Sequence, residues 1–257
     1  MAASAAKTIV LITGANSGVG FELAAQLLAK ESYHVLLGAR STQKGNTALQ
    51  DLQSRKLPGS VEFLEIDATK DDTIERAAKS VEQNHGHLDV LVNNAAIAAM
   101  EGPLRQEMRD AFDTNATGPL IIGQTFLPLL QAAVSKSTAK AVPSPRVINV
   151  HSGAGSIARR LEPSSMMYKM KGGFGYRTSK AALSMVTACQ FVEYGDVGVK
   201  VFAYDPGFTV SNLGPHNNVE QGARSAEESV RPLVDLIEGK RDDEAGKILH
   251  NTGGWPW

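Results

Sequence analysis

The sequence predicts an α/β fold in which helices cover both faces of one doubly wound parallel sheet. The first observation is an alternation along the chain: short apolar runs typical of strands are separated by longer stretches with the apolar spacing of helices. Apolar strands joined by helical crossovers are typical of a parallel sheet buried between helices. The second observation is that no Pro-, Gly- or Ser-rich linker and no repeat divides the 257 residues, which predicts a single domain over 1–257.

The elements follow one another regularly in the first half and less regularly in the second. In chain order the first half is expected to form strand 8–13, helix 19–30, strand 34–38, helix 43–57, strand 61–66, helix 71–84 and strand 88–93. The second half is expected to form helices 105–115 and 119–135, strand 146–151, helix 176–194, strand 200–204, helix 226–238 and strand 246–250. Residues 133–145 are expected to be a surface connection.

Composition excludes several classes of protein. Apolar residues make up 42% of the chain, enough for a substantial core, and the net charge is −1 with no block of Lys or Arg. A nucleic-acid binder would carry a basic patch, so no nucleic-acid partner is expected. The one cysteine, Cys189, cannot form an internal disulfide, which suits a reducing compartment. No secretory signal is recognisable and no segment approaches the ~18 apolar residues of a membrane span, so a cytoplasmic protein without a membrane partner is expected.

The turn between the first strand and the first helix is rich in glycine. Its sequence TGANSGVG spaces the glycines as Gly14-x3-Gly18-x-Gly20. Such glycines allow a tight bend and a close approach of the backbone to a pyrophosphate, which the helix N-terminus attracts. The spacing matches neither G-x-G-x-x-G nor a P-loop. The turn favours a Rossmann-type nucleotide site, and the alternative is a tight connection that binds nothing.

Tyr176 and Lys180 are the first catalytic candidates. They lie four residues apart in a stretch with a helical pattern, so their side chains share one face with Cβ atoms roughly 5–6 Å apart. Tyr168 is also followed by lysines, but Gly172 stands four residues after it, in a loop-like stretch. An ammonium placed beside a phenol lowers the pKa of the phenol. The alternative is that the pair is an ordinary helix face.

Six short motifs place these features in a wider pattern. They are TGANSGVG (13–20), NNAA (93–96), NATG (115–118), a serine after RVINVH (146–151), YRTSK (176–180) and PGF (206–208). In this order, over essentially the whole chain, they resemble the short-chain dehydrogenase/reductase family, and 34–96 is most similar to its NADPH-dependent carbonyl reductases. The resemblance implies an NADP-dependent oxidoreductase that reduces a ketone, aldehyde or quinone. It implies that 8–150 mainly bind the cofactor and that 151–257 carry the catalytic and substrate-binding residues.

Arg40 indicates which nicotinamide cofactor is used. The second expected strand is followed by GARST, with no acidic residue from 36 to 42. An acid near this position would bind the ribose 2′-hydroxyl of NAD, whereas a guanidinium suits the 2′-phosphate of NADP. NADPH is therefore the expected cofactor, and the alternative is that Arg40 is a solvated surface residue. Carbonyl reductases often carry a second basic residue in the glycine turn, where this chain has Ser17, so some use of NADH is compatible with the sequence.

Other cofactor contacts are expected from the resemblance. An aspartate matching Asp67 holds the adenine in that family, with Ala68 beside it, although Asp67 is equally suited to be a helix N-cap. Asn94 matches a residue near the adenosine ribose, Ala96 stands where the family has glycine, and Ser211 stands where threonine is common. The expected contacts are Gly14, Asn16, Ser17, Gly18, Val19, Gly20, Arg40, Asp67, Ala68, Asn94, Tyr176 and Lys180, with Pro206, Gly207, Thr209 and Ser211 closing on the nicotinamide carboxamide.

Tyr176 is expected to be the general acid in carbonyl reduction and the general base in alcohol oxidation. A free tyrosine has a pKa of about 10, too high for easy proton exchange at neutral pH, so a nearby ammonium is needed to lower it. Lys180 is expected to supply that charge and, by the resemblance, to hold the nicotinamide ribose. Proton transfer of this kind accelerates a reaction by typically about 10²–10⁴-fold.

Two further residues complete the expected constellation. Ser152 matches the family serine, whose hydroxyl would hydrogen-bond the substrate oxygen, while Ser156 falls outside the matching frame. Asn115 matches the residue that fixes a water in a proton relay, with an ordinary helix terminator as the alternative. His151 adjoins Ser152, but neighbours on a strand face opposite ways, so it is expected to be a packing residue.

The gap between Ser152 and Tyr176 is longer than is common in the family. The extra residues, 157–173, are expected to lie near the cleft, with Tyr168 in a lid or wall, and the alternative is a surface excursion. The loop 208–224 and the tail 252–257 are also candidates to enclose substrate. Two tail residues, Trp255 and Trp257, are equally suited to terminal packing.

Two rival functions remain open from the sequence. One is an NAD(P)-dependent alcohol dehydrogenase that works in the oxidative direction. The other is a regulator that senses NADPH without turnover, which would not need the general acid that Tyr176 provides. The partner is expected to be a small carbonyl or alcohol substrate, and a homo-oligomer through the long central helices or the last strand is also considered.

Overall fold

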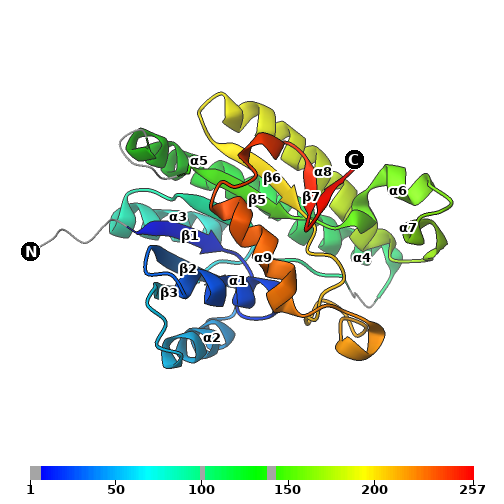
Figure 1. Ribbon diagram of the computed structural model, residues 1–257, viewed down its shortest axis with the longest axis horizontal. Coiled ribbons are helices and arrows are strands. Elements are labelled where there is room, and N and C mark those ends of the chain that lie inside the picture. Colours follow the sequence, from blue (N-terminus) through cyan, green and yellow to red (C-terminus); the bar gives the residue numbers. More distant parts are fainter. Residues whose placement is uncertain (1–6, 99–101, 138–142) are drawn as a thin grey trace, which may run out of the picture.

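The computed structural model describes residues 7–98, 102–137 and 143–257. In these residues the chain forms an eight-stranded sheet in the order β3-β2-β1-β4-β5-β6-β7-β8, and all neighbouring pairs are parallel except β7 and β8 (Figure 1). This confirms the single doubly wound α/β domain. The strands are β1 (Thr8–Ile12), β2 (Tyr33–Ala39), β3 (Ser60–Glu65), β4 (Val90–Asn93), β5 (Arg146–Val150), β6 (Lys200–Tyr204), β7 (Ile248–His250) and β8 (Gly253–Trp255).

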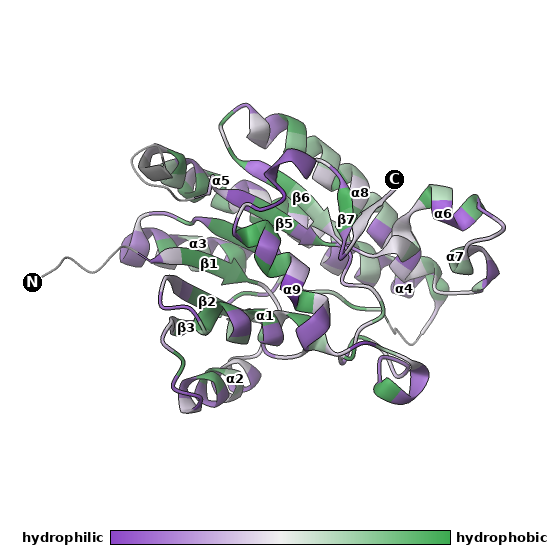
Figure 2. Ribbon diagram, in the orientation of Figure 1, coloured by the Kyte–Doolittle hydropathy of each residue, from purple (hydrophilic) through white to green (hydrophobic). Residues whose placement is uncertain are grey.

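Two helical layers cover the two faces of the sheet. The helices of the first layer are α1 (Gly18–Leu28), α2 (Thr42–Ser54) and α9 (Ala226–Ile237), and those of the second are α3 (Asp71–His85), α5 (Gly118–Ser137) and α8 (Phe174–Gly195). Each layer packs against its own hydrophobic core, and Figure 2 shows the hydrophobic strands between helices with hydrophilic outer faces.

The strands are apolar on both faces because each face supplies one core. In β1, Val10 and Ile12 belong to the core beneath α1 and α9, whereas Ile9 and Leu11 belong to the core beneath α3 and α5. Successive side chains of a strand point to opposite faces, so an uninterrupted apolar run fills both cores at once. The same rule explains why the sequence pattern identified these strands correctly.

The order of strands reverses between β1 and β4. From β1 the chain moves outward to β2 and β3, then crosses back to β4 and continues in the other direction. The loops after the carboxyl ends of β1 and β4 therefore run in opposite directions, and a crevice opens between them. Open α/β sheets bind their ligands in such a crevice. The glycine turn follows β1, and the NNAA motif begins at the end of β4.

The expected helices 105–115 and 119–135 are joined in the structure. Helix α4 (Leu104–Phe112) runs through a π-helical turn (Asp113–Thr117) directly into α5. Among the described residues one helix, Leu104–Ser135, is consequently long and apolar enough to cross a membrane by length and composition alone, which corrects the expectation from the sequence. Several of its residues, including Phe126 and Leu130, are buried in the core beneath the sheet. We therefore describe it as a core helix.

The second half contains elements that the sequence did not predict. Residues 157–173 include two short helices, α6 (Ile157–Leu161) and α7 (Met166–Lys169), which lie beside the C-terminus in Figure 1. The last parallel strand is followed by a hairpin to β8, three residues that are too short to show an alternating pattern. The expected connection 133–145 begins later, because α5 continues to Ser137, and its residues 138–142 lie outside the described part.

Candidate active site

A cleft of about 900 Å³ lies at the carboxyl edge of the sheet. It extends from the residues after β2 and β3, past the glycine turn, to the residues after β5 and the start of α8. All the residues expected from the sequence line it except Gly20 and Asn115, both of which lie behind its wall. The lining residues among them are Gly14, Asn16, Ser17, Gly18, Val19, Arg40, Asp67, Ala68, Asn94, Ser152, Tyr176, Lys180, Pro206, Gly207, Thr209 and Ser211.

The glycine turn is held tightly against the loop after β4. Gly14 has φ +63°, and a Cβ added there would lie 2.9 Å from the Cα of Ala95. A Cβ on Gly20 would lie 2.5 Å from Nδ2 of Asn94, so this glycine serves packing. Ser17 is the N-cap of α1 but makes no side-chain cap bond, and no acidic residue stands in the first turn. The N-terminus of α1 therefore retains backbone donors that suit an anion.

The side chain of Asn94 is hydrogen-bonded to the glycine turn. Its Nδ2 donates to the carbonyl oxygens of Thr13 at 2.8 Å and Gly14 at 3.2 Å, while Oγ1 of Thr13 accepts from the backbone N–H groups of Asn94 and Ala95, each at 3.0 Å. Asn94 lines the cleft as expected. Its amide nitrogen, however, is already satisfied by the protein, so its contribution there is to hold the turn in shape.

Asp67 is not a helix N-cap, which corrects that alternative. The N-cap of α3 is Lys70, and Oδ1 of Asp67 accepts from the backbone N–H of Thr69 at 3.1 Å and from its hydroxyl at 2.8 Å. This local turn fixes the carboxylate in the cleft next to Ala68. The backbone oxygen of Ala68 would lie 2.6 Å from a Cβ on Gly118, so the loop packs closely on α5.

Arg40 is exposed at the far end of the cleft, after β2. Within residues 7–98, 102–137 and 143–257 its guanidinium has no ion-pair or hydrogen-bond partner. Lys44 lines the same wall from the first turn of α2, where it follows the N-cap Ser41. Sequence reasoning missed Lys44, although its spacing of four residues from Arg40 was the available signal. The two residues place two cations in this part of the cleft wall, which Asp51 and Asp67 also line.

Tyr176 and Ser152 meet at the other end of the cleft. Tyr176 projects from the first turns of α8, Ser152 follows β5, and the Ser152 hydroxyl is close enough to the phenol to lower its pKa. Lys180, one turn later on α8, places its Nζ 5.8 Å from the centre of the Tyr176 ring and donates to the carbonyl of Val150 at 2.7 Å. The structure thus brings together in the cleft three of the four residues that the sequence proposed as catalytic.

The pKa values of these groups differ from the expectation. Burial raises the pKa of Tyr176 to about 12, while the hydrogen bond with Ser152 opposes the rise and Asp205 adds to it. Burial lowers the pKa of Lys180 to about 8, against the opposing influence of Asp205. The predicted lowering of the Tyr176 pKa by Lys180 is therefore wrong for the protein alone. The ammonium donates to the carbonyl of Val150, and Lys180 is not among the groups that move the pKa of Tyr176, on which desolvation has the largest effect.

Asp205 is a buried carboxylate that sequence reasoning missed. Its Oδ2 accepts from the backbone N–H of Gly153 and from the indole of Trp255, each at 2.8 Å, and its Oδ1 accepts from Gly207 at 2.8 Å. One side chain therefore ties together the loop of Ser152, the PGF loop and the C-terminal hairpin. The only signal in the sequence was an acid immediately before PGF.

The residues of 157–173 and the tail pack against each other beside the cleft. The guanidinium of Arg159 lies 3.7 Å above the ring of Trp255, and the hydroxyl of Ser156 donates to the carbonyl of Pro256 at 2.6 Å. Because its hydroxyl is bound to Pro256, Ser156 is not a candidate for the role expected of Ser152. Tyr168 is 46% exposed and, like the rest of 157–173, is not among the residues that line the cleft. The segment therefore does not line the cleft, and it is also not an excursion that touches nothing, because it packs against the C-terminal tail.

Asn115 is fully buried in the π-helical turn. Its Oδ1 accepts from the backbone N–H of Ile97 at 2.9 Å, and its Nδ2 donates to the carbonyl of Ile97 at 2.8 Å and to the hydroxyl of Ser179 at 3.0 Å. These bonds join the loop after β4 to the residue before Lys180. Single π turns inside helices often occur at functional sites. This one positions the Asn115 amide to bind both the loop after β4 and the first turns of α8.

His151 lies behind Lys180. Its Nε2–H donates to the carbonyl of Lys180 at 2.6 Å and to the hydroxyl of Ser184 at 2.8 Å. Burial, with the charge of Lys180, lowers the pKa of His151 to about 4, so the ring is neutral near pH 7. These contacts give Nε2 a packing role, whereas Nδ1 is buried without a hydrogen-bond partner among the described residues, and His151 itself lines the cleft.

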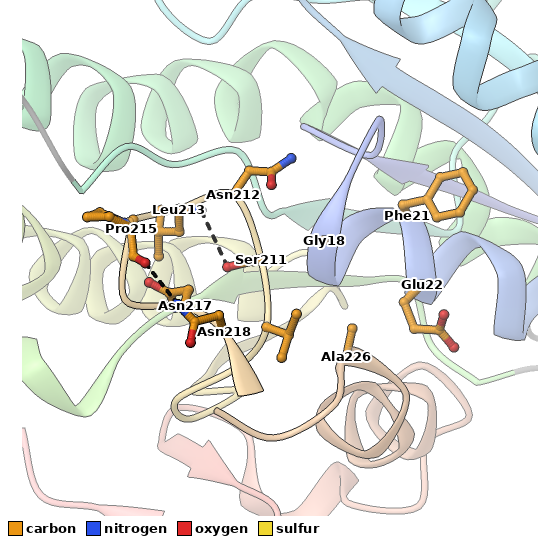
Figure 3. Close-up of a pocket in the computed structure, with 12 residues that line it drawn as sticks. Gly18, Phe21, Glu22, Ser211, Asn212, Leu213, Pro215, Asn217, Asn218 and Ala226 are labelled. Atoms are coloured by element: carbon orange, nitrogen blue, oxygen red, sulfur yellow. Dashed lines mark hydrogen bonds between the residues drawn. The ribbon is translucent and has the colours of Figure 1, made fainter. Parts of the chain in front are cut away.

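A second pocket of about 790 Å³ adjoins the cleft between the start of α1 and the loop 210–218 (Figure 3). Gly18 and Ser211 line both spaces. The loop is braced by Asn217, whose Nδ2 donates to the carbonyl of Thr209 at 2.9 Å and whose carbonyl accepts from the backbone N–H of Ser211 at 3.1 Å. It therefore forms a defined wall beside the glycine turn.

Comparisons with known proteins agree with this geometry. A family model described as short chain dehydrogenase matches residues 8–221. The chain is 37% identical over 263 residues to the short-chain dehydrogenase anuI of Penicillium roqueforti, covering 98% of this chain and 100% of that protein. It is 34% identical over 152 residues to carbonyl reductase (NADPH) 1 of Mus musculus, covering 58% of this chain and 50% of that protein. The structure of an NADPH-bound carbonyl reductase from chicken fatty liver matches with a TM-score of 0.84 at 28% identity, covering 98% of this chain and 100% of that one.

Proposed function

The chain belongs to the short-chain dehydrogenase/reductase family and is an oxidoreductase, and from this premise we propose that it is an NADPH-dependent carbonyl reductase. Its substrate would be a ketone, an aldehyde or a quinone, which it would reduce to the corresponding alcohol or hydroquinone. A cytoplasmic location, suited to its single exposed cysteine, is part of the proposal.

One observation carries this proposal: the side chains of Tyr176, Ser152 and Lys180 line the same cleft, and the Ser152 hydroxyl is close enough to the phenol to act on the pKa of Tyr176. Two hydroxyl groups that converge in this way can both contact one carbonyl oxygen. Because the pKa of Tyr176 is raised to about 12, the phenol keeps its proton at physiological pH. A protonated tyrosine suits reduction, which needs a proton donor, better than alcohol oxidation, which needs a base.

The residues of the cleft fit a dinucleotide cofactor. The glycine turn leaves no space for side chains where the backbone has to approach a pyrophosphate, and the N-terminus of α1 offers uncapped donors. After β2, Arg40 and Lys44 line the cleft and would bind a 2′-phosphate, which supports NADPH over NADH. Two similar proteins are described as NADPH-bound or NADPH-dependent carbonyl reductases, which supports the same choice.

The mechanism follows from the positions of the side chains. When bound, the nicotinamide would supply the hydride to the carbonyl carbon. Ser152 would donate a hydrogen bond to the carbonyl oxygen and stabilise the negative charge that develops there. Tyr176 would then transfer its proton to that oxygen, which completes the alcohol, and the charge of Lys180 would stabilise the resulting phenolate. Asp205 and Asn115 would hold the loops that carry these groups.

The test is cofactor consumption by the purified protein with NADPH and, separately, NADH, across ketones, aldehydes and quinones. We expect turnover with NADPH, a weaker response with NADH, and an alcohol or hydroquinone identified by mass spectrometry. Oxidation of alcohols by NADP that is faster than every reduction would favour the alcohol dehydrogenase. Tight NADPH binding without turnover of any compound would favour the non-catalytic sensor.

A further inference from the structure

Three residues that can bind a metal ion gather at the end of the sheet opposite the cleft. His34 lies at the start of β2, Glu62 lies in the edge strand β3, and His85 is the last residue of α3. One ligand atom of each, a ring nitrogen or a carboxylate oxygen, lies within 4.8 Å of the others. Six residues of extended strand separate His34 from Arg40, so the cluster lies about 20 Å from that end of the cleft.

Strand register explains why these side chains meet. His34 pairs with Ser60 in the parallel ladder, and Glu62 stands two residues after Ser60, so the three share the face that α3 covers. The helix ends at His85, because Gly86 adopts φ +71°, and the ring of His85 lies 5.0 Å from that of His34. Two strands and one helix thus contribute one ligand each.

The hydrogen bonds of His34 leave one ring nitrogen available. Its Nδ1 lies 2.8 Å from the hydroxyl oxygen of Ser60, which also accepts from Nζ of Lys7 at 3.1 Å. The Ser60 hydroxyl can accept from Nδ1 or donate to it while it accepts from Lys7, so both tautomers satisfy this contact. In the tautomer that carries the proton on Nδ1, Nε2 has a free lone pair. This Nε2 is buried without a hydrogen-bond partner in the described residues, a cost of about 1–3 kcal/mol for an ordinary polar group.

The unpartnered nitrogen faces the carboxylate of Glu62. The distance from Nε2 of His34 to Oε1 of Glu62 is 3.7 Å, too long for a hydrogen bond, and Nε2 of His85 lies 2.9 Å from the same oxygen. Zinc binds imidazole nitrogen and carboxylate oxygen at about 2.0–2.2 Å with tetrahedral geometry, which places donor atoms about 3.3 Å apart. These two distances lie on either side of that value, and all three ligand atoms lie within 4.8 Å of one another, so the three side chains would have to close in on one point to hold an ion.

We propose that His34, Glu62 and His85 form a binding site for a divalent transition-metal ion, with zinc as the best match to two imidazoles and one carboxylate. Binding would displace the proton between Glu62 and His85 and would use the lone pair of His34. The side chain of Glu62 is 42% exposed, so water would complete the fourth position. The ion would fasten the edge strand β3 to β2 and α3. Its role would be stabilising, since the reaction cleft lies at the other edge of the sheet.

The first test is titration of tag-free, metal-free protein with Zn²⁺ by calorimetry and with Co²⁺ by visible absorption. We expect one ion per chain, the intense absorption bands of a tetrahedral Co²⁺ site and a higher melting temperature with Zn²⁺. His85→Gln should weaken Zn²⁺ binding by about a hundredfold or more, since even residues behind metal ligands contribute about 10–100-fold. The matched control is His87→Gln, two residues further on and outside the cluster, which should bind as the wild type does.

Glu62→Gln provides a second variant at an exposed position, where loss of folding is not expected. It should also weaken Zn²⁺ binding, while circular dichroism and NADPH binding stay as in the wild type. The proposal is overturned if the wild-type chain binds no ion tighter than millimolar. It is equally overturned if His85→Gln and Glu62→Gln bind Zn²⁺ as tightly as the control, because the three residues would then be only a carboxylate shared by two histidines.

Discussion

Tyr176 and Lys180 lie one helical turn apart, and burial moves their pKa values in opposite directions. The pKa of Tyr176 is raised to about 12 and that of Lys180 is lowered to about 8. Removal from water disfavours the charged form of each group, which is the phenolate for tyrosine and the ammonium for lysine. Near neutral pH the tyrosine therefore holds its proton firmly, while the lysine is closer to losing its charge.

The first prediction is the pH dependence of carbonyl reduction. Because the pKa of Lys180 is lowered from 10.5 to about 8, its charge is present below that pH and disappears as the pH rises through it. We expect kcat with NADPH to be level from about pH 6 to about pH 7.5 and to fall above about pH 8. Measuring kcat and KM across this range checks it. A rate that increases steadily into alkaline solution would indicate that the phenolate, not the phenol, is the active form.

The second prediction concerns cofactor choice. Arg40→Ala should weaken NADPH binding by about 10–100-fold, because a guanidinium–phosphate contact is lost, and should leave NADH binding nearly unchanged. Lys44→Ala should act in the same direction with a smaller effect. Fluorescence titration with both cofactors measures these affinities. The control is Arg76→Ala, whose side chain is exposed on α3. Equal losses for NADPH and NADH would exclude a 2′-phosphate contact at Arg40.

The third prediction is a change in acid stability from His151. The pKa of His151 is lowered from 6.5 to about 4, so the folded protein binds fewer protons than the unfolded chain between these values. Its stabilising contribution is complete above about pH 6.5 and is lost as the pH falls toward 4, a total on the order of 3 kcal/mol. His151→Gln can still donate to Lys180 and does not titrate. Urea unfolding from pH 7 to pH 4 should show a shallower loss for the variant, and identical slopes would refute this account.

At the scale of elements, the C-terminal hairpin of β7 and β8 supports the catalytic loops. Trp255 in β8 donates to Asp205, which also binds the backbone next to Ser152 and the PGF loop. The same indole stacks on His250 at 4.1 Å and lies beneath Arg159. A three-residue strand at the edge of the sheet therefore has consequences inside the cleft.

The fourth prediction compares the two tryptophans of the tail. Trp255→Ala should lower the free energy of unfolding by about 2 kcal/mol, because a buried carboxylate loses a hydrogen-bond donor, and should lower kcat more than it changes NADPH affinity. Trp257→Ala, whose side chain is 41% exposed, should change neither. Denaturant unfolding and steady-state kinetics of both variants test this. Equal behaviour of the two would show that the hairpin does not position the loops.

Some elements could be predicted from the sequence and others could not, for physical reasons. Strand β1 could be predicted because both of its faces are buried, so the residues after Thr8 are all apolar. The union of α4 and α5 could not be predicted, because Gly118 and Pro119 are typical of a helix boundary, yet the π turn before them runs directly into α5, which begins at Gly118. Strand β8 depends on pairing with β7 over three residues, which leaves no periodic pattern.

For the whole molecule, the topology brings distant parts of the chain to one crevice. Motifs separated by well over a hundred residues, such as the glycine turn and the PGF loop, line the same cleft because all their strands end at one edge. The motif order predicted this gathering. It did not predict the role of Asp205, the contribution of Lys44 to the cleft wall or the direction of the Tyr176 pKa shift, since these depend on packing between segments that no local pattern describes.

The most direct test of the account is Tyr176→Phe beside the wild-type protein, with NADPH and a carbonyl substrate identified in the panel. The variant lacks only the phenolic hydroxyl, so we expect NADPH to bind with unchanged affinity while kcat falls by at least about 10²–10⁴-fold. That combination would establish Tyr176 as the proton donor of a reductase. A variant that turns over at the wild-type rate would contradict the central claim and move the chemistry to another group in the cleft.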